Sequence, residues 1–157
     1  MVDSEFAPPD PPVRLLAAFQ EIFPEQELLW LVRAPGRDTW IAAAQSGNDT
    51  FTVAFPDMDA RATFSLQSAR VRRTVLQRPL PRWARYPAGV TLTVDNEGLD
   101  VTGLNMVVMA SEPPGPQYDY GVGIAFAALW HEILEQPYTT DRLLEIVDRA
   151  RREYVEE

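Results

Sequence analysis

Cysteine is absent from the 157-residue sequence, and histidine occurs once, at His131. Without thiols the chain can form neither a disulfide nor a thiolate metal site. A zinc site needs several nitrogen, sulfur or oxygen ligands held together, and a single imidazole without any thiolate argues against one. The sequence therefore predicts no metal site.

Positive charge is also scarce. The 14 basic residues are outnumbered by 23 acidic ones, which gives a formal net charge of −9. Nucleic acids and anionic membranes are bound by basic faces, so this balance argues against both as partners. An anionic small molecule such as ATP would need a local positive site in such a chain.

Long apolar runs are missing as well, since no run reaches the length of a membrane span. The beginning of the chain is acidic and rich in proline, unlike a signal peptide, so we expect a soluble cytoplasmic protein. Residues 1–12 are expected to form a flexible arm. The length and the 46% of hydrophobic residues predict one folded domain over residues 13–157.

The most informative stretch is 103–134. Leu104 to Ala110 is nearly all apolar, as in a buried strand, and residues 121–134 predict a buried helix. Between them, residues 111–120 are expected to form a loop, because they include Pro113, Pro114, Gly115 and Pro116. Strand, glycine-containing loop and buried helix is the layout of a phosphate-binding loop.

The rest of the chain predicts more strands first and helices later, which is typical of an α+β domain. Two of the strands, 39–44 and 51–55, are expected to form a hairpin through 45–49. The helices expected are 13–23, ended by Pro24, 83–94, with Pro87 near its start, and a last helix capped by Thr139 or Thr140. The further strands expected are 28–33, 62–66 and 71–76.

Six segments form an ordered set along the chain. They are RLLAAFQEIF at 14–23, RAPGR at 33–37, Trp83-x-x-Tyr86-x-x-Gly89, GLNMVV at 103–108, EPPG at 112–115 and ARREYV at 150–155. In this order they resemble the galactokinases of the GHMP kinase superfamily. The resemblance implies the N-terminal domain of a two-domain kinase, with the α+β fold of that superfamily (ribosomal protein S5 domain 2-like), a mixed sheet packed with helices.

The sugar-binding motif of that family departs from its pattern here. After RAPGR, galactokinases carry Glu, His and Asp residues that grip sugar hydroxyls, and the matching positions are Ala43, Ala44 and Ser46. Each hydroxyl that leaves water must find a hydrogen-bond partner, and alanine side chains offer none. The resemblance therefore implies that sugar recognition by the family's route is lost.

The ATP loop departs as well from the family pattern Pro-x-Gly-x-Gly-Leu-Ser-Ser-Ser-Ala. Pro113 and Gly115 match, but Gln117 replaces the second glycine and Pro114 and Pro116 carry no N–H donor. Asp119 adds a carboxylate, and the serine hydroxyl expected on Mg²⁺ is missing. The serine positions hold Asp119, Tyr120 and Gly121, and the family's catalytic aspartate falls beyond Glu157.

Single residues allow two interpretations each. Arg37 matches the family's transition-state arginine, or it is a surface residue after a tight turn. Asp119 is expected to cap a helix rather than to act as an acid or base. His131 is expected on a helix, half exposed rather than catalytic. Trp83 and Trp130 are expected in the core, and Arg70, Arg72 and Arg73 on one solvated strand face.

The hypothesis from the sequence is a galactokinase-like N-terminal domain that is non-catalytic and has no cofactor. The first alternative is an active ATP-dependent sugar kinase, or a subunit of a split kinase, which would use ATP and Mg²⁺. The second alternative is a binding module with a less polar pocket lined by Ala43, Ala44 and Tyr118.

A homodimer or an unidentified protein partner is expected through the last helix or its neighbouring strands, because the apolar stripe of that helix is wide. The stripe consists of Leu143, Leu144, Ile146, Val147, Ala150, Tyr154 and Val155.

Overall fold

The computed structural model describes residues 13–156, so the arm expected at 1–12 lies outside the described residues. Four of the five described strands precede the helices at Leu66–Arg70 and Arg85–Asn96, and the chain also has short 3-10 helices at Pro56–Met58 and Arg82–Ala84 and a π-helical turn at Arg151–Val155. The main elements are α1 (Val13–Ile22), β1 (Trp30–Arg33), β2 (Thr39–Gln45), β3 (Thr50–Phe55), β4 (Ala60–Ser65), α2 (Leu66–Arg70), α3 (Arg85–Asn96), β5 (Leu104–Ala110), α4 (Pro116–Ile133) and α5 (Thr140–Ala150).

The strands form one mixed sheet in the order β1-β2-β5-β3-β4. β3 and β5 run parallel, and the other neighbours are antiparallel. β5 lies in the middle, and its residues from Met106 to Met109 are buried. This confirms the buried strand expected at 104–110 and the α+β class, because a strand covered on both faces must be apolar along its whole length.

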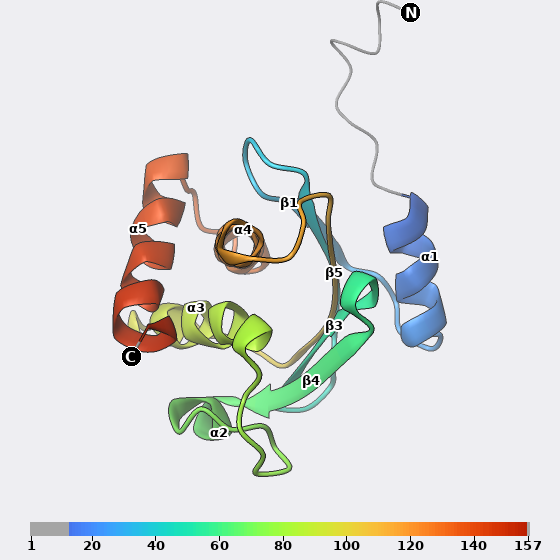
Figure 1. The fold of residues 1–157 in the computed structure, drawn as a ribbon, viewed down its shortest axis with the longest axis horizontal. Coiled ribbons are helices and arrows are strands. Elements are labelled where there is room, and N and C mark those ends of the chain that lie inside the picture. The colour runs from blue at the N-terminus through green and yellow to red at the C-terminus, as the bar shows by residue number, and fades with distance from the viewer. Residues whose placement is uncertain (1–12, 157) are drawn as a thin grey trace, which may run out of the picture.

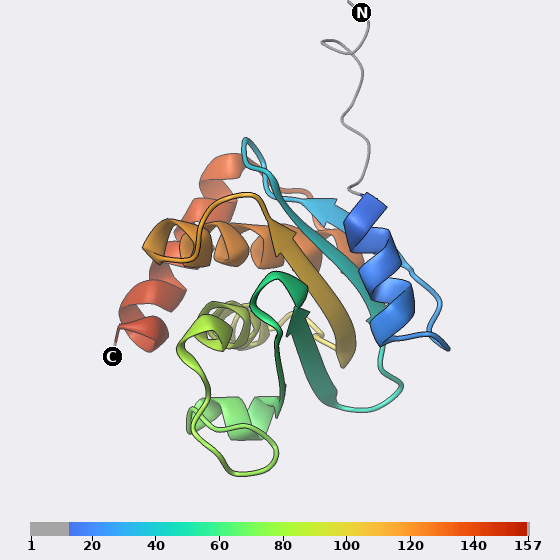
Figure 2. The ribbon, with the colours of Figure 1, turned by 45° about the vertical axis from the view of Figure 1, so that its right-hand side comes forward.

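The helices cover the sheet unequally. Figure 1 shows α3, α4 and α5 together on one side of the sheet and α1 on the other, and the turned view in Figure 2 shows the same layers. The larger core lies under the three helices and includes Phe51, Phe126 and Trp130. The smaller core lies under α1, where Leu15 and Phe19 pack on the opposite face of the sheet.

The hairpin expected between 39–44 and 51–55 is wrong, because β5 lies between β2 and β3. The connection instead folds on itself: the Asn48 side-chain oxygen accepts from the Thr50 N–H at 2.9 Å, and the Ser46 N–H donates to the Gly103 carbonyl at 3.1 Å. A β-carbon on Gly103 would collide with the Asn48 carbonyl oxygen and the Ser46 hydroxyl. Glycine therefore lets β5 enter the sheet beside this turn.

The strand expected at 71–76 is also wrong. The chain leaves the sheet after Ser65, whose hydroxyl accepts from the Ser68 N–H at 3.0 Å while the Ser68 hydroxyl accepts from the Ser65 N–H at 2.9 Å. This reciprocal cap starts α2 and ends the alternating pattern. Residues after α2 form turns in which Arg72 and Gln77 have positive φ values of 56° and 65°. The alternating apolar and polar residues at 71–76 therefore belong to turns and not to a strand.

The three arginines expected on one strand face consequently point to separate partners. Arg70 pairs with Asp95 at 3.0 Å, and Arg73 donates to the Gln77 carbonyl at 2.8 Å. Arg72 donates to the Tyr154 carbonyl at 3.1 Å and lies 4.8 Å from the centre of that ring. Arg70 and Arg72 thus connect α2 and the following turn to α3 and to the turn after α5, whereas Arg73 bonds within its own turn.

The expected helices are confirmed, with small shifts of their ends. Pro87 lies in the first turn of α3, where its missing N–H leaves no bond unmade. The Thr139 hydroxyl caps α5 by accepting from the Arg142 N–H at 3.2 Å. Trp130 is fully buried, and Trp83 is half-buried against the same core, as expected.

The wide apolar stripe of the last helix is used inside the domain. Leu143 and Val147 are fully buried in the larger core, and Leu144 and Val155 pack partly against it. The helix contacts both α3 and α4. The stripe is wide because α5 packs against two helices at once, so it gives no support for a partner on this face.

None of the helices between residues 13 and 156 combines the length and the apolar character that a bilayer crossing requires.

Candidate functional site

The site lies at the start of α4, which begins earlier than the sequence predicts. Gly115 precedes the helix with a φ of 152°, and Pro116 is its first residue. The Asp119 N–H donates to the Gly115 carbonyl at 2.9 Å, so Asp119 lies inside the first turn and is not the cap. Proline is favoured at the first helical position because its φ is already helical, which explains why the expected loop ends at residue 115.

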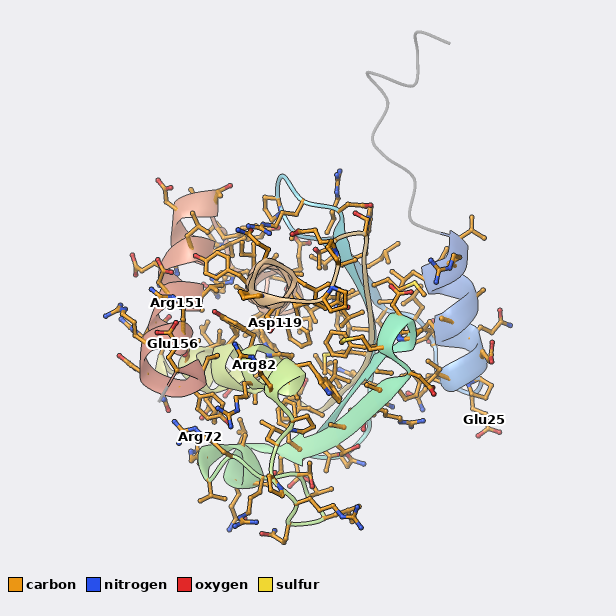
Figure 3. All side chains as sticks on the ribbon, in the orientation of Figure 1. Glu25, Arg72, Arg82, Asp119, Arg151 and Glu156 are labelled. Atoms are coloured by element: carbon orange, nitrogen blue, oxygen red, sulfur yellow. The ribbon has the colours of Figure 1, made fainter. Side chains whose placement is uncertain are left out.

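A cleft of about 690 Å³ opens beside this helix start. Its walls come from the first turn of α4, from the 3-10 helix and first turn of α3, and from the π-helical turn that follows α5. Figure 3 labels Arg82, Asp119, Arg151 and Glu156 between these elements. The charged residues lining the cleft are Arg37, Arg82, Arg85, Asp119, Arg151 and Glu156.

Arg37 reaches the cleft from the turn between β1 and β2. Its Nη1 lies 3.1 Å from Glu112 Oε1 and 3.3 Å from the Gln117 carbonyl oxygen, and its guanidinium lies 5.8 Å from the centre of the Tyr120 ring. A β-carbon on Gly121 would come within 3.2 Å of that Nη1. Gly121 thus leaves room for the arginine against α4.

The other three arginines make few contacts within the described chain. Arg85 donates to the Val155 carbonyl at 3.4 Å, while its Nε is buried without a partner. Arg151 lies 3.2 Å from Glu156 Oε2 and 3.8 Å from Asp148 Oδ1. No ion-pair partner of Arg82 lies among residues 13–156. Guanidinium groups with unused donors are suited to bind an oxyanion.

The lining carries four arginines against two carboxylates, so it is locally positive in a chain of net charge −9. Burial raises the pKa of the Asp119 carboxyl, and the Arg82 guanidinium partly offsets this effect. The raised pKa means that the folded protein resists a full negative charge at this position. The cleft therefore favours anions over cations.

Two tyrosines complete the wall of the cleft. Burial raises the pKa of Tyr86 to about 12. Burial and a hydrogen bond of 3.0 Å to the Asp148 carboxylate raise the pKa of Tyr120. Both phenols are therefore neutral at physiological pH, and they add apolar surface with polar ends rather than charge.

The residues at the sugar-binding positions do not reach the cleft. Ala43 and Ala44 lie inside β2, fully buried and on opposite faces of the sheet, in the larger and the smaller core respectively. The Ser46 hydroxyl bonds within its own turn, donating to the Thr50 carbonyl at 3.1 Å. Tyr118 is also buried, so the less polar pocket expected from Ala43, Ala44 and Tyr118 is wrong, because core packing encloses all three.

The remaining residues of the degenerate loop divide between two elements. Pro113, Pro114 and Gly115 precede the helix, whereas Gln117 and Gly121 belong to it. His131, expected to be half exposed, is buried on α4, and its Nδ1 lies 2.7 Å from the Ala127 carbonyl oxygen. It lies at the far end of α4 from the cleft and takes no part in the site.

The side chains present fit an anion better than a metal ion. Among residues 13–156 there is no group of three or more histidine, aspartate or glutamate side chains that could hold a metal. The phosphates of ATP would meet guanidinium groups and a helix start, which suit them. Mg²⁺ prefers carboxylate oxygens and water in octahedral geometry, and the arginine-rich lining does not offer that arrangement.

Sequence reasoning missed Arg82, Arg85 and Arg151 as site residues. Arg82 and Arg85 are three residues apart at the start of α3, Arg151 follows α5, and no motif spacing links either segment to Arg37. One compositional signal was present: all 14 basic residues are arginine, and lysine is absent. Arginine offers a planar fork of donors and stays charged when partly buried, which suits oxyanion sites.

Comparison of the sequence with protein-family models gives no match. No curated protein matches it either. Comparison of the fold with solved structures gives matches of high probability. A galactokinase from Lactococcus lactis, solved in complex with galactose, superimposes with a TM-score of 0.70 at 10% identity, over 92% of this chain and 42% of that one.

Two mevalonate kinases also match, each with a TM-score of 0.57 over 73% of this chain. One is 11% identical over 37% of its own length, and the other, from Methanococcus jannaschii, is 10% identical over 36%. The chain thus spans less than half the length of these neighbours. At such identities the likeness establishes the fold, and that fold is the one found in GHMP kinases, as the resemblance implied.

Proposed function

We propose that this chain, which shares its fold with GHMP kinases, is a non-catalytic kinase-like domain that binds a phosphate-bearing small molecule in the arginine cleft. The observation that carries the proposal is the convergence of Arg37, Arg82, Arg85 and Arg151 beside the first turn of α4. In an acidic protein such a cluster repels itself unless an anion or nearby carboxylates compensate it. Glu112 pairs with Arg37, and Glu156 and Asp148 lie beside Arg151, whereas Arg82 has no ion-pair partner among residues 13–156.

Backbone groups support binding at the same place. The first hydrogen bond within α4 is made by the Asp119 N–H, so the N–H groups of Gln117 and Tyr118 have no helical partner. Both belong to the positive end of an 18-residue helix. Because Pro116 lacks an N–H, this backbone cradle is weaker than a glycine-rich one, and the arginine side chains supply the rest of the attraction.

The non-catalytic part of the proposal is supported by what surrounds the cleft. The positions that match the family's sugar ligands are buried alanines in β2 and a serine bonded within its own turn. The carboxyl nearest to the helix start is Asp119, whose pKa is raised by burial. The side chains at these positions therefore give a sugar hydroxyl no set of hydrogen-bond partners of the kind that the family's pattern would supply.

Two measurements on the full chain test this proposal. A thermal-shift series with ATP and inorganic phosphate should show stabilisation, because a ligand at 100 times its dissociation constant adds roughly 2.7 kcal/mol. A coupled assay of ADP release should show no turnover that depends on galactose. No stabilisation by either ligand would overturn the binding, and galactose-dependent turnover would overturn the loss of catalysis.

A second candidate, a subunit of a split kinase, is favoured by the position of Arg37. The resemblance gives this residue the transition-state role, and it lies in the cleft with one Nη within reach of Glu112 and the Gln117 carbonyl. The candidate requires that turnover appear when a second chain is added that corresponds to the part of the neighbours' length this chain does not span, and that Arg37→Ala remove this turnover. Turnover that persists in Arg37→Ala would exclude this role for Arg37.

A further inference from the structure

We infer that the arginine cleft binds a polyphosphate without any divalent cation, its guanidinium groups taking the place of the metal. This inference rests on the proposed function, since it specifies how the same cleft would hold its ligand. It differs from that function in one testable respect: Mg²⁺ should weaken binding rather than support it. The charges, the geometry and the lack of metal ligands each contribute to the argument.

The charges in the cleft are mostly guanidinium groups. The lining has four arginines and two carboxylates, and two further carboxylates, Glu112 and Asp148, pair with Arg37 and Arg151 from outside the lining. Oxyanions bind guanidinium groups through paired, charge-assisted hydrogen bonds. A polyphosphate in this cleft would meet guanidinium donors, whereas a divalent cation would be brought among four like charges.

Each carboxylate near the cleft is paired with an arginine or has a pKa that burial raises. Glu112 pairs with Arg37 at 3.1 Å, and Glu156 pairs with Arg151 at 3.2 Å. Burial raises the pKa of the Asp119 carboxyl. A hard cation binds to free anionic oxygens, so none of these groups is well prepared to receive it. This agrees with the lack of a three-residue metal cluster within residues 13–156.

The arrangement suits more than one phosphate group. Arg37 lies against α4, with its Nη1 3.3 Å from the Gln117 carbonyl, whereas Arg151 belongs to the turn after α5 and Arg85 to the start of α3. The cleft between them has a volume of about 690 Å³, which exceeds the space that a single phosphate occupies. A ligand with two or more linked phosphates can contact arginines from different walls at once.

One arginine in the cleft has no ion-pair partner within the described chain and is available to such a ligand. This is Arg82, which pairs with no carboxylate among residues 13–156 and is exposed at the rim of the cleft. A bound polyphosphate would supply acceptors for its guanidinium. Arg85 Nε also lacks a hydrogen bond, but it is buried, so a ligand in the cleft does not reach it.

Calorimetry on the full chain with pyrophosphate as the probe tests the inference. Titrations are run in EDTA and in millimolar Mg²⁺ at equal ionic strength. We expect pyrophosphate to bind at least about tenfold more weakly in Mg²⁺, because the metal neutralises the free ligand. Tighter binding in Mg²⁺ would overturn the inference and leave the proposed anion binding intact. An absence of binding in both buffers would overturn the proposed function as well.

A variant pair shows whether the effect belongs to this cleft. Arg82→Gln should weaken pyrophosphate binding in EDTA by about threefold to tenfold, since it removes one charge at the rim. Arg78→Gln removes the same charge from the turn after α2, outside the cleft, and should leave binding unchanged. Equal losses in both variants would show that only net charge matters, and would overturn the assignment to the cleft.

Discussion

Arg37 and Glu112, 75 residues apart in the sequence, form an ion pair of 3.1 Å beside the first turn of α4. Both side chains are about one quarter to one third exposed, at 25% and 30%. The pair joins the turn after β1 to the loop after β5, so it fixes the arginine at the edge of the cleft. It also gives Arg37 a carboxylate that any incoming anion must compete with.

Glu112→Gln is expected to strengthen anion binding. The amide keeps the shape of the side chain but removes the competing charge, so pyrophosphate should bind roughly twofold to fivefold more tightly, in line with the value of a partly exposed ion pair. Calorimetry measures the change. Glu21→Gln, on the exposed face of α1 across the sheet, removes the same charge and is the control. A similar gain in both variants would show a general charge effect.

Asp119→Asn should strengthen anion binding and stabilise the fold near neutral pH. At an effective dielectric near 20, one like charge within several ångströms of a phosphate costs about 2 kcal/mol before screening. Salt screens part of this cost, so we expect the affinity for pyrophosphate to rise about threefold to tenfold. Calorimetry of both proteins with pyrophosphate checks this gain. Asp141→Asn, at the exposed start of α5, is a control for the loss of one carboxylate.

The same residue predicts a dependence of stability on pH. Burial raises the pKa of the Asp119 carboxyl, so the folded state holds this proton more tightly than the unfolded state. Its contribution to stability is therefore present at low pH and is lost as the pH rises through the folded pKa. Denaturant melts of the wild type and Asp119→Asn should differ more at pH 7 than at pH 4. If the two proteins differed in their free energy of unfolding by the same amount at both pH values, the raised pKa of Asp119 would be contradicted.

The sequence allowed the central elements of the fold to be predicted. β5 and α4 are almost entirely apolar because the sheet and helices cover them, and that burial shows directly in their composition. The order of the strands was not accessible in the same way. The polar turn 45–49 has the composition of a hairpin, yet Gly103 lets β5 pass beside it and separate the two strands. Local turn chemistry does not specify which strands pair.

The candidate site was only partly predictable for a related reason. Arg37 and the loop before α4 stand in recognisable motifs, so their neighbourhood could be expected. Arg82 and Arg85 lie at the start of α3 and Arg151 lies in the turn after α5, and only the packing of α3 and α5 against α4 brings these two segments together. The net charge of −9 gave no indication of this arginine cluster, because a sum over the whole chain does not show where the charges lie.

Gly89→Ala is expected to destabilise the domain by about 1–3 kcal/mol through overpacking. A β-carbon at this position would lie 2.9 Å from Tyr154 Cδ1 and 3.3 Å from its Cβ. The ring cannot easily move, because its hydroxyl donates to the Ala69 carbonyl at 2.5 Å and Arg72 lies over its face. Denaturant unfolding measures the loss. In a Tyr154→Ala background the same substitution should cost little, and an undiminished cost there would rule out this clash.

Leu143→Ala tests whether the stripe of α5 serves the interior or a partner. Leu143 is fully buried among α3, α4 and α5, so truncation should lower the free energy of unfolding by about 2–5 kcal/mol. Leu76→Ala removes the same atoms from a side chain that is 75% exposed, and should change stability by less than about 0.5 kcal/mol. A homodimer or another partner stays a prediction, which sedimentation of the wild type at micromolar concentration addresses. If the wild type were a dimer and Leu143→Ala made it a stable monomer, α5 would be an interface, and the packing described for it would be wrong.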